Sequence, residues 1–241
     1  MSGKGRFYLT TAIDYVNSTP HLGTAYEKVA ADVLARLRRI EGYDTFFLMG
    51  NDEHSQNVER AAQKAGKTPQ AYCDEMAAVF RRTWERLEIS CDDFIRTTEP
   101  RHRLAVEALF TAIHRAGDIY KGTYAGFYCV SCEAFLPEKE LLDGRCRIHE
   151  TTPEWITEDN YFFRLSAYTE RLTRHIQEHP GFICPESRRN EILALLDQGL
   201  TDISISRAGG TWGIPLPIDP SHTIYVWFDA LINYLSAISS Q

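Results

Sequence analysis

A change in the spacing of apolar residues near the amino-terminus constrains the fold more than any other feature of the sequence. Residues 7–11 form an unbroken apolar or β-branched run, which predicts a buried strand. Residues 45–50 predict a second buried strand. Between them the apolar residues recur every three or four positions, which predicts a helix with a core face made of Val29, Ala30, Val33, Leu34 and Leu37. A strand, a helix and a strand within about fifty residues form a βαβ unit, so we predict an α/β fold with a parallel sheet.

The start of this helix has the chemistry of an anion site. His21 and Gly23 lie where the helix begins, after a loop at 17–20. The first N–H groups of a helix have no partner within it, and the helix dipole places partial positive charge there. An imidazole can donate a hydrogen bond to a phosphate oxygen, and a glycine lets a ligand approach the backbone closely. We therefore expect a phosphate-bearing ligand, such as a triphosphate, at this helix start.

Polar residues follow the second predicted strand directly, in the order Asn51, Asp52, Glu53 and His54. In open α/β sheets, ligands bind at the carboxyl ends of the strands. The sequence thus places a candidate binding site at residues 51–54.

Two pairs of soft donors predict a metal site. Cys129 and Cys132 are separated by two residues, as are Cys146 and His149. Three thiolates and one imidazole complete a tetrahedral shell suited to Zn²⁺ and leave no open position for catalysis. We predict a structural zinc site that stabilises a segment with little core of its own.

Length and composition are those of a globular protein in a reducing compartment. The 241 residues suffice for one large domain or a domain with a sizeable insertion, and 44% of them are hydrophobic. The net charge of -7 provides no global electrostatic case for nucleic acid, so any RNA would bind through a local patch. No apolar run approaches the roughly 18 residues that a membrane span requires, and we expect a cytoplasmic protein.

The rest of the chain alternates between helical and extended patterns. Helices are predicted at 55–65, 69–87, 100–116, 166–178, 188–200 and from residue 230 onward. Extended segments are predicted at 92–98, 119–128, 155–164, 202–206 and 222–228.

Several motifs occur in the order in which they occur in the bacterial methionyl-tRNA synthetases, a family of class I aminoacyl-tRNA synthetases, and the chain resembles this family along essentially its whole length. His21-Leu-Gly-Thr24 resembles the class I His-x-Gly-His signature, and Gly50-Asn-Asp-Glu-His54 resembles the family's Gly-Thr-Asp-Glu-His loop. The two Cys/His pairs are similar to its zinc knuckle. The remaining matches are Asn160-Tyr-Phe-Phe163, Arg189-Asn-Glu191, Ile205-Ser-Arg207, Trp212-Gly-Ile-Pro215 and Tyr225-Val-Trp-Phe-Asp-Ala230.

This resemblance implies a Rossmann fold, incomplete here, that is split by a connective insertion with the zinc knuckle. The first half would span 1–117, the insertion 118–221 with the knuckle near 127–150, and the start of the second half 222–241. The implied reaction is activation of L-methionine by Mg²⁺-ATP to methionyl-adenylate, followed by transfer to tRNA(Met).

The resemblance also assigns residues by position. His21 and Thr24 would be catalytic, and ATP would contact His21, Gly23, Thr24 and Glu27. Asp52 would hold the methionine ammonium, while aromatic faces would recognise the polarizable thioether. The methionine site would comprise Ala12, Ile13, Tyr15, Asp52, Trp227, Ala230, Leu231 and Tyr234.

The sequence departs from the family pattern in three respects. Thr24 stands where the signature has its second histidine, and Asp14 stands where the family often has a bulkier or cyclic residue. No lysine follows Lys139, so the family's lysine-rich second signature loop is not in this sequence. The chain therefore resembles the amino-terminal part of a longer protein, whose remaining carboxy-terminal part would be a partner.

Two other functions are compatible with the same residues. The chain could belong to another class I ligase or to a small nucleotidyltransferase, which share the phosphate motif. It could also be a non-catalytic zinc-containing module that binds RNA or a protein partner. Amino-acid selectivity would separate the first of these from a methionine enzyme, and salt-dependent RNA binding without methionine affinity would identify the second.

Overall fold

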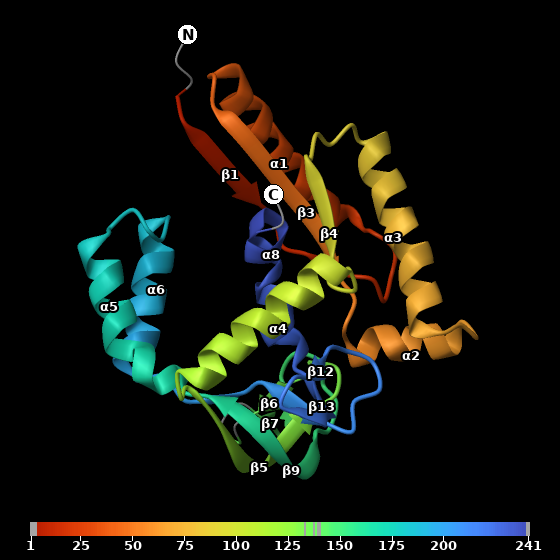
Figure 1. Cartoon of the computed structure of the whole chain (residues 1–241), viewed down its shortest axis with the longest axis vertical. Coiled ribbons are helices and arrows are strands. Elements are labelled where there is room, and N and C mark those ends of the chain that lie inside the picture. Colours follow the sequence, from red (N-terminus) through yellow and green to blue (C-terminus); the bar gives the residue numbers. More distant parts are fainter. Residues whose placement is uncertain (1–3, 133, 137, 139–140, 240–241) are drawn as a thin grey trace.

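The computed structural model of the chain describes residues 4–132, 134–136, 138 and 141–239 (Figure 1). Met1, Lys139 and Gln241, which figure in the sequence predictions, lie outside the described residues. Within the described part, no helix has the length and apolar character needed to cross a membrane.

A parallel sheet forms the first part of the chain, as the βαβ pattern predicted. Its central strand β3 (Asp44–Asp52) pairs in parallel with β1 (Arg6–Thr10) and with β4 (Asp93–Arg96). Leu48 of β3 has a partner in both strands, so β1 and β4 lie on opposite sides of β3. The short strand β2 (Asp14–Tyr15) pairs with the carboxyl end of β3, and all these pairings are parallel.

Helix α1 (Leu22–Ile40) lies between the first strands and β3 in the βαβ unit. The core face that the sequence predicted for this helix was wrong. The buried residues of the helix are Lys28, Asp32 and Ala35. Lys28 and Asp32 can be buried because Asp14 and Ser90, which lie outside the helix, pair with them. Of the apolar residues that the pattern assigned to the core, Leu34 is half-buried, while Val29, Ala30, Val33 and Leu37 are exposed. We call the exposed apolar set the α1 stripe, which consists of Leu22, Tyr26, Val29, Val33, Leu37 and Ile40.

Three further helices surround this sheet: α2 (Gln56–Lys64), α3 (Pro69–Arg86) and α4 (Pro100–Arg115). Side-chain oxygens of Ser55 and Thr68 accept hydrogen bonds from the first turns of α2 and α3, so the sequence located both helix starts correctly. Figure 1 shows α3 beside the sheet and α4 crossing the middle of the molecule. The core between sheet and helices includes Phe47, Met49, Met76, Phe80, Trp84 and Phe94.

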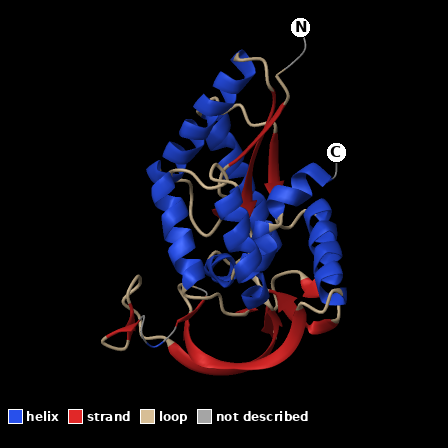
Figure 2. Ribbon diagram, turned by 90° about the vertical axis from the view of Figure 1, so that its left-hand side faces the viewer, coloured by secondary structure: helices blue, strands red, loops and turns tan. Residues whose placement is uncertain are grey.

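The middle of the chain forms a second, antiparallel sheet in the order β10-β9-β5-β6. Its long strands β5 (Ile119–Cys129) and β9 (Glu154–Phe163) pair along ten residues each, and Figure 2 shows them as a strongly curved ribbon. The strands β6 (Ala134–Leu136) and β10 (Ile203–Ser204) flank them, and β7 (Leu141–Leu142) forms a hairpin with β8 (Arg145–Cys146). A 3-10 turn (Leu165–Tyr168) leads into a helical hairpin of α5 (Thr169–Glu178) and α6 (Glu186–Asp197).

The last part of the chain returns to the first. Strands β11 (Ser206–Ala208), β12 (Pro215–Leu216) and β13 (Asp219–Ile224) form a small antiparallel sheet, and α7 (Val226–Leu231) and α8 (Asn233–Ser239) follow. The strand predicted at 222–228 was wrong from Tyr225 onward, because Tyr225 is the N-cap of α7 and Val226 begins the helix. Helix α8 packs against α4 and β4, which brings the end of the chain to the parallel sheet.

Candidate active site and metal centre

The start of α1 is closed by a reciprocal cap between His21 and Thr24. His21 Nδ1 accepts hydrogen bonds from the N–H groups of Gly23 (3.0 Å) and Thr24 (3.3 Å). In return, Thr24 Oγ1 accepts from the His21 N–H (3.0 Å) and donates to the His21 carbonyl oxygen (2.8 Å). The N–H groups of the second and third residues of the helix are therefore engaged by His21, whereas the sequence had led us to expect the first N–H groups to be free for a ligand.

This cap fixes the tautomer of His21. Because Nδ1 accepts two N–H groups, the proton of the neutral ring lies on Nε2. The ring is exposed, so Nε2–H can donate to an anion in front of the helix. A Cβ at Gly23 would lie 3.0 Å from His21 Cε1, so a side chain here would press on the capping ring, and the predicted contact of Gly23 with ATP stays a prediction.

A buried lysine holds the segment before the helix. The amino group of Lys28 is fully buried and donates to the Ala12 carbonyl oxygen at 2.8 Å. It also pairs with Asp14 Oδ2 at 3.1 Å and with Glu27 Oε2 at 3.0 Å, while the other Glu27 oxygen accepts from the Ala12 N–H. Burial raises the pKa of Asp14, and Lys28 opposes that shift. Sequence reasoning missed Lys28, because a lysine in an amphipathic helix usually lies in solvent.

The end of β3 gathers four of the residues assigned to methionine. Asp52 is buried, and Tyr15 is its neighbour in register on β2. Ile13 and Tyr234 pack together against the same small core cluster. Burial raises the pKa of Tyr234, and the negative charges of Glu27 and Asp52 act in the same direction, which places this phenol near both carboxylates.

The other residues assigned to the methionine site are less buried than Asp52. Ala12 is exposed and is held through its backbone, as described above. On α7, Ala230 is half-buried, while Trp227 is 51% and Leu231 65% exposed. Their part in a methionine pocket stays a prediction.

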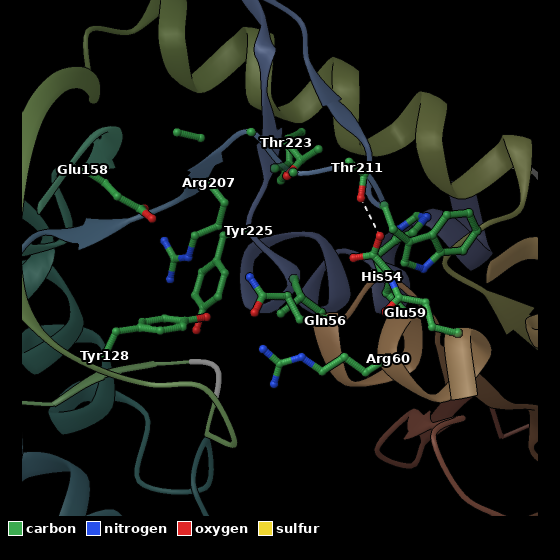
Figure 3. A pocket seen from close by; sticks show the side chains of 17 residues that line it. His54, Gln56, Glu59, Arg60, Tyr128, Glu158, Arg207, Thr211, Thr223 and Tyr225 are labelled. Carbon is green, nitrogen blue, oxygen red and sulfur yellow. Dashed lines mark hydrogen bonds between the residues drawn. The ribbon is translucent and has the colours of Figure 1, made fainter. Parts of the chain in front are cut away.

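A polar cavity of about 280 Å³ lies between α2 and the small sheet (Figure 3). Arg60 from α2 and Arg207 from β11 point into it, and the Arg207 guanidinium lies 3.9 Å from the centroid of the Tyr225 ring. His54 forms part of its wall, with its ring edge against Trp212. Of the described residues that line this cavity, none belongs to the predicted methionine site.

The four predicted metal ligands come together as expected. Cys129 ends β5 and Cys132 follows in the next turn, while Cys146 ends β8 and His149 lies in the turn after it. Their ligand atoms all lie within 4.8 Å of one another, with Cys132 Sγ 3.5 Å from Cys146 Sγ and 3.2 Å from His149 Nδ1. These separations suit donors around one tetrahedral ion with metal–ligand bonds of about 2.0–2.3 Å. The cluster can therefore hold a metal ion.

The pKa values of two thiols in the knuckle are shifted in opposite directions. Backbone N–H groups of His149 and Ile148 lower the pKa of Cys146 to about 6, while burial raises the pKa of Cys132 to about 12. The hairpin between β7 and β8 turns through Asp143 and Gly144, both with positive φ, and so brings Cys146 to the ligand cluster.

Comparisons with known proteins agree with this geometry. The family profile described as "tRNA synthetases class I (M)" matches residues 7–141 and 138–241. Methionine–tRNA ligases of Thermosynechococcus vestitus and Thermotoga maritima are 53% and 51% identical over 96% and 97% of this chain. The chain covers 44% and 38% of those two proteins.

Solved structures give the same result. The chain matches the Mycobacterium tuberculosis methionyl-tRNA synthetase bound by methionyl-adenylate with a TM-score of 0.91 and 46% identity over 96% of this chain. It matches the apo form of that enzyme with a TM-score of 0.81 and 43% identity over 98% of this chain. In both comparisons the chain covers 46% of the solved protein.

The parallel sheet, the histidine-capped helix and the Cys/His knuckle are thus those of a class I tRNA synthetase, in an α/β fold as predicted. Within that class the match extends over nearly the whole chain. The chain belongs to the family of tRNA synthetases class I (M), whose curated relatives here are methionine–tRNA ligases.

Proposed function

We propose that this chain supplies the methionine site and part of the ATP site of a methionine–tRNA ligase, which activates L-methionine with Mg²⁺-ATP and transfers it to tRNA(Met). The observation that carries the proposal is the buried Asp52 carboxylate at the end of β3, whose register neighbour on β2 is Tyr15 and whose charge acts on the Tyr234 phenol. The relative matched with a TM-score of 0.91 is described as bound by methionyl-adenylate, which supports a methionine enzyme. The primary ammonium of methionine would pair with Asp52.

The ATP site follows from the cap of α1. We assign His21 Nε2–H to a phosphate oxygen in the transition state, because Nδ1 is held by the helix. The Thr24 hydroxyl is engaged in the cap, so Thr24 would act on ATP by holding His21 in place. Glu27 keeps 42% of its side chain exposed beside Lys28 and would lie near the nucleotide.

The metal is proposed to be Zn²⁺, bound by Cys129, Cys132, Cys146 and His149. Three sulfur donors and one imidazole nitrogen favour zinc over oxygen-seeking ions such as Mg²⁺. All four tetrahedral positions are filled by protein, so the ion would be structural.

The predicted units, with boundaries at 117 and 221, are retained as part of this proposal. The chain spans about 37–46% of the length of the curated relatives it matches. We propose that the remaining part of such a protein packs on the α1 stripe, which would otherwise leave six apolar side chains in water.

Isothermal titration of the chain with L-methionine tests the proposal, with leucine, isoleucine and cysteine as competitors. We expect selective methionine binding that Asp52→Ala abolishes, because the bound ammonium would lose its counter-charge. Asp44→Ala, on the exposed end of the same strand, is the matched control and should bind normally. Unchanged affinity in Asp52→Ala would rule out the assigned pocket.

A further inference from the structure

The carboxylate of Asp229 is completely buried and lies between two histidines. Its Oδ2 accepts a hydrogen bond from His54 Nδ1 at 2.8 Å, and its Oδ1 lies 3.5 Å from His102 Nε2. The histidine side chains are 7% and 0% exposed. On its other side, His102 Nδ1 lies 2.9 Å from Ser236 Oγ, which is also buried. The four side chains form a continuous polar chain inside the protein.

These four residues come from four different elements. His54 follows β3 two residues after Asp52, and His102 lies on α4. Asp229 lies on α7 between the methionine candidates Trp227 and Ala230, and Ser236 lies on α8. The polar chain therefore joins the strand end that carries the ammonium partner to the two helices that carry the thioether partners.

The negative charge of the buried Asp229 carboxylate has to be compensated by nearby groups. Burial opposes its ionisation, but the two histidines hold the pKa of Asp229 below its ordinary value. Among the residues that the structure describes, Asp229 Oδ1 has no hydrogen-bond partner, so the charge depends on the nearby imidazoles. His54 is fixed from another side by Trp212, whose Nε1 donates to the Glu53 carbonyl oxygen at 2.6 Å. Moving α7 would leave a buried charge uncompensated, which is costly.

Hydrolytic chemistry does not explain the arrangement. Ser236, His102 and Asp229 have the residue types of a catalytic triad, but all three side chains are fully buried, so no substrate reaches the hydroxyl. These contacts are instead suited to holding α4, α7, α8 and the end of β3 together.

We propose that Asp229 is a positioning residue of the methionine site, which holds α7 and α8 in register with the strand end that carries Asp52. This inference rests on the proposed function. It assigns no contact with substrate to Asp229, which acts through the helices and through His54.

The test is methionine titration of Asp229→Asn and Asp229→Ala, well below the unfolding temperature of each variant. We expect Asp229→Ala to weaken methionine binding at least about tenfold, because both histidines lose their partner. Asp229→Asn still accepts from His54 and should retain more affinity. Asp219→Asn, which removes the carboxylate beside His222 in β13, is the matched control and should bind normally.

A second pair of variants decides the question if Asp229→Ala does not fold. His54→Asn places an amide N–H near the position of Nδ1 and should bind methionine nearly as well as the unmodified chain, whereas His54→Leu should not. If the Asp229 and His54 variants have a lower unfolding temperature but bind methionine with unchanged affinity, this inference is overturned while the proposed function stands. If the unmodified chain does not bind methionine, the proposed function fails as well.

Discussion

Lys28→Met is expected to destabilise the chain more than any surface substitution, and the structure indicates by how much. The contact with Glu27 contributes at most about 1 kcal/mol, because that carboxylate is 42% exposed and water replaces the lysine. Asp14 is only 9% exposed, so leaving its charge without Lys28 costs about 3–5 kcal/mol. We therefore expect the free energy of unfolding to fall by about 3–5 kcal/mol, or the melting temperature by roughly 6–20 °C.

Urea unfolding measures this effect. Lys64→Met on α2, an exposed lysine, is the matched control and should change the free energy of unfolding by less than about 0.5 kcal/mol. The double variant Lys28→Met with Asp14→Leu should recover most of the loss, because apolar groups then replace both charges. A loss below about 1 kcal/mol in Lys28→Met would refute the reasoning.

The same variant predicts a dependence on pH. Lys28 lowers the pKa of Asp14 against the rise caused by burial, so its removal raises that pKa further. A carboxyl group whose folded pKa is raised contributes stability below its unfolded pKa of about 3.9, and that contribution is lost as pH rises through the folded pKa. The difference between Lys28→Met and the unmodified chain should therefore be larger at neutral pH than in mild acid. A difference that grows on acidification would contradict this account.

Three further predictions test other parts of the molecule. Cys129→Ser should lose stoichiometric zinc by metal analysis and lower the melting temperature; an unchanged zinc content would exclude the proposed ligand set. Gly23→Ala places a methyl group 3.0 Å from His21 Cε1, so the gain of about 1 kcal/mol usual for this change in a helix should be cancelled by loss of the cap, and urea unfolding that shows the full gain would argue against it. Val33→Lys in the α1 stripe should change the free energy of unfolding of this chain by less than about 0.5 kcal/mol, because Val33 is 63% exposed, and a larger loss in urea unfolding would contradict the surface position of the stripe.

The sequence located those features that depend on residue type and short spacing. The starts of α1, α2 and α3 and each of the two metal-ligand pairs involve residues within a few positions of each other. In each case a local hydrogen bond or a ligand pair determines the structure. Such local patterns can be recognised in a sequence without knowledge of the tertiary fold.

The errors have a common physical cause in distant partners. The core face of α1 was assigned to Val33 and its neighbours, but the buried Asp32 pairs with Ser90, which is 58 positions away. The strand predicted through Val226 rested on a run of β-branched and aromatic residues. The first three residues of this run end β13 as predicted, but its last three begin α7, where the buried partners of Asp229 are the distant His54 and His102. Hydrophobic periodicity does not register a buried charge whose partner lies elsewhere in the chain.

The two acidic residues at the end of β3 illustrate how such partners separate structural from binding roles. Glu53 is fully buried, and Arg96 lies 2.7 Å from one of its oxygens while Thr98 donates to the other. Its charge is already compensated by protein, so it is not suited to hold a substrate cation. Asp52, one residue earlier, is placed beside Tyr15 and near Tyr234. We therefore expect different effects from the last residue of β3 and the residue that follows it: Glu53→Gln should lower the free energy of unfolding, and Asp52→Ala should lower methionine affinity.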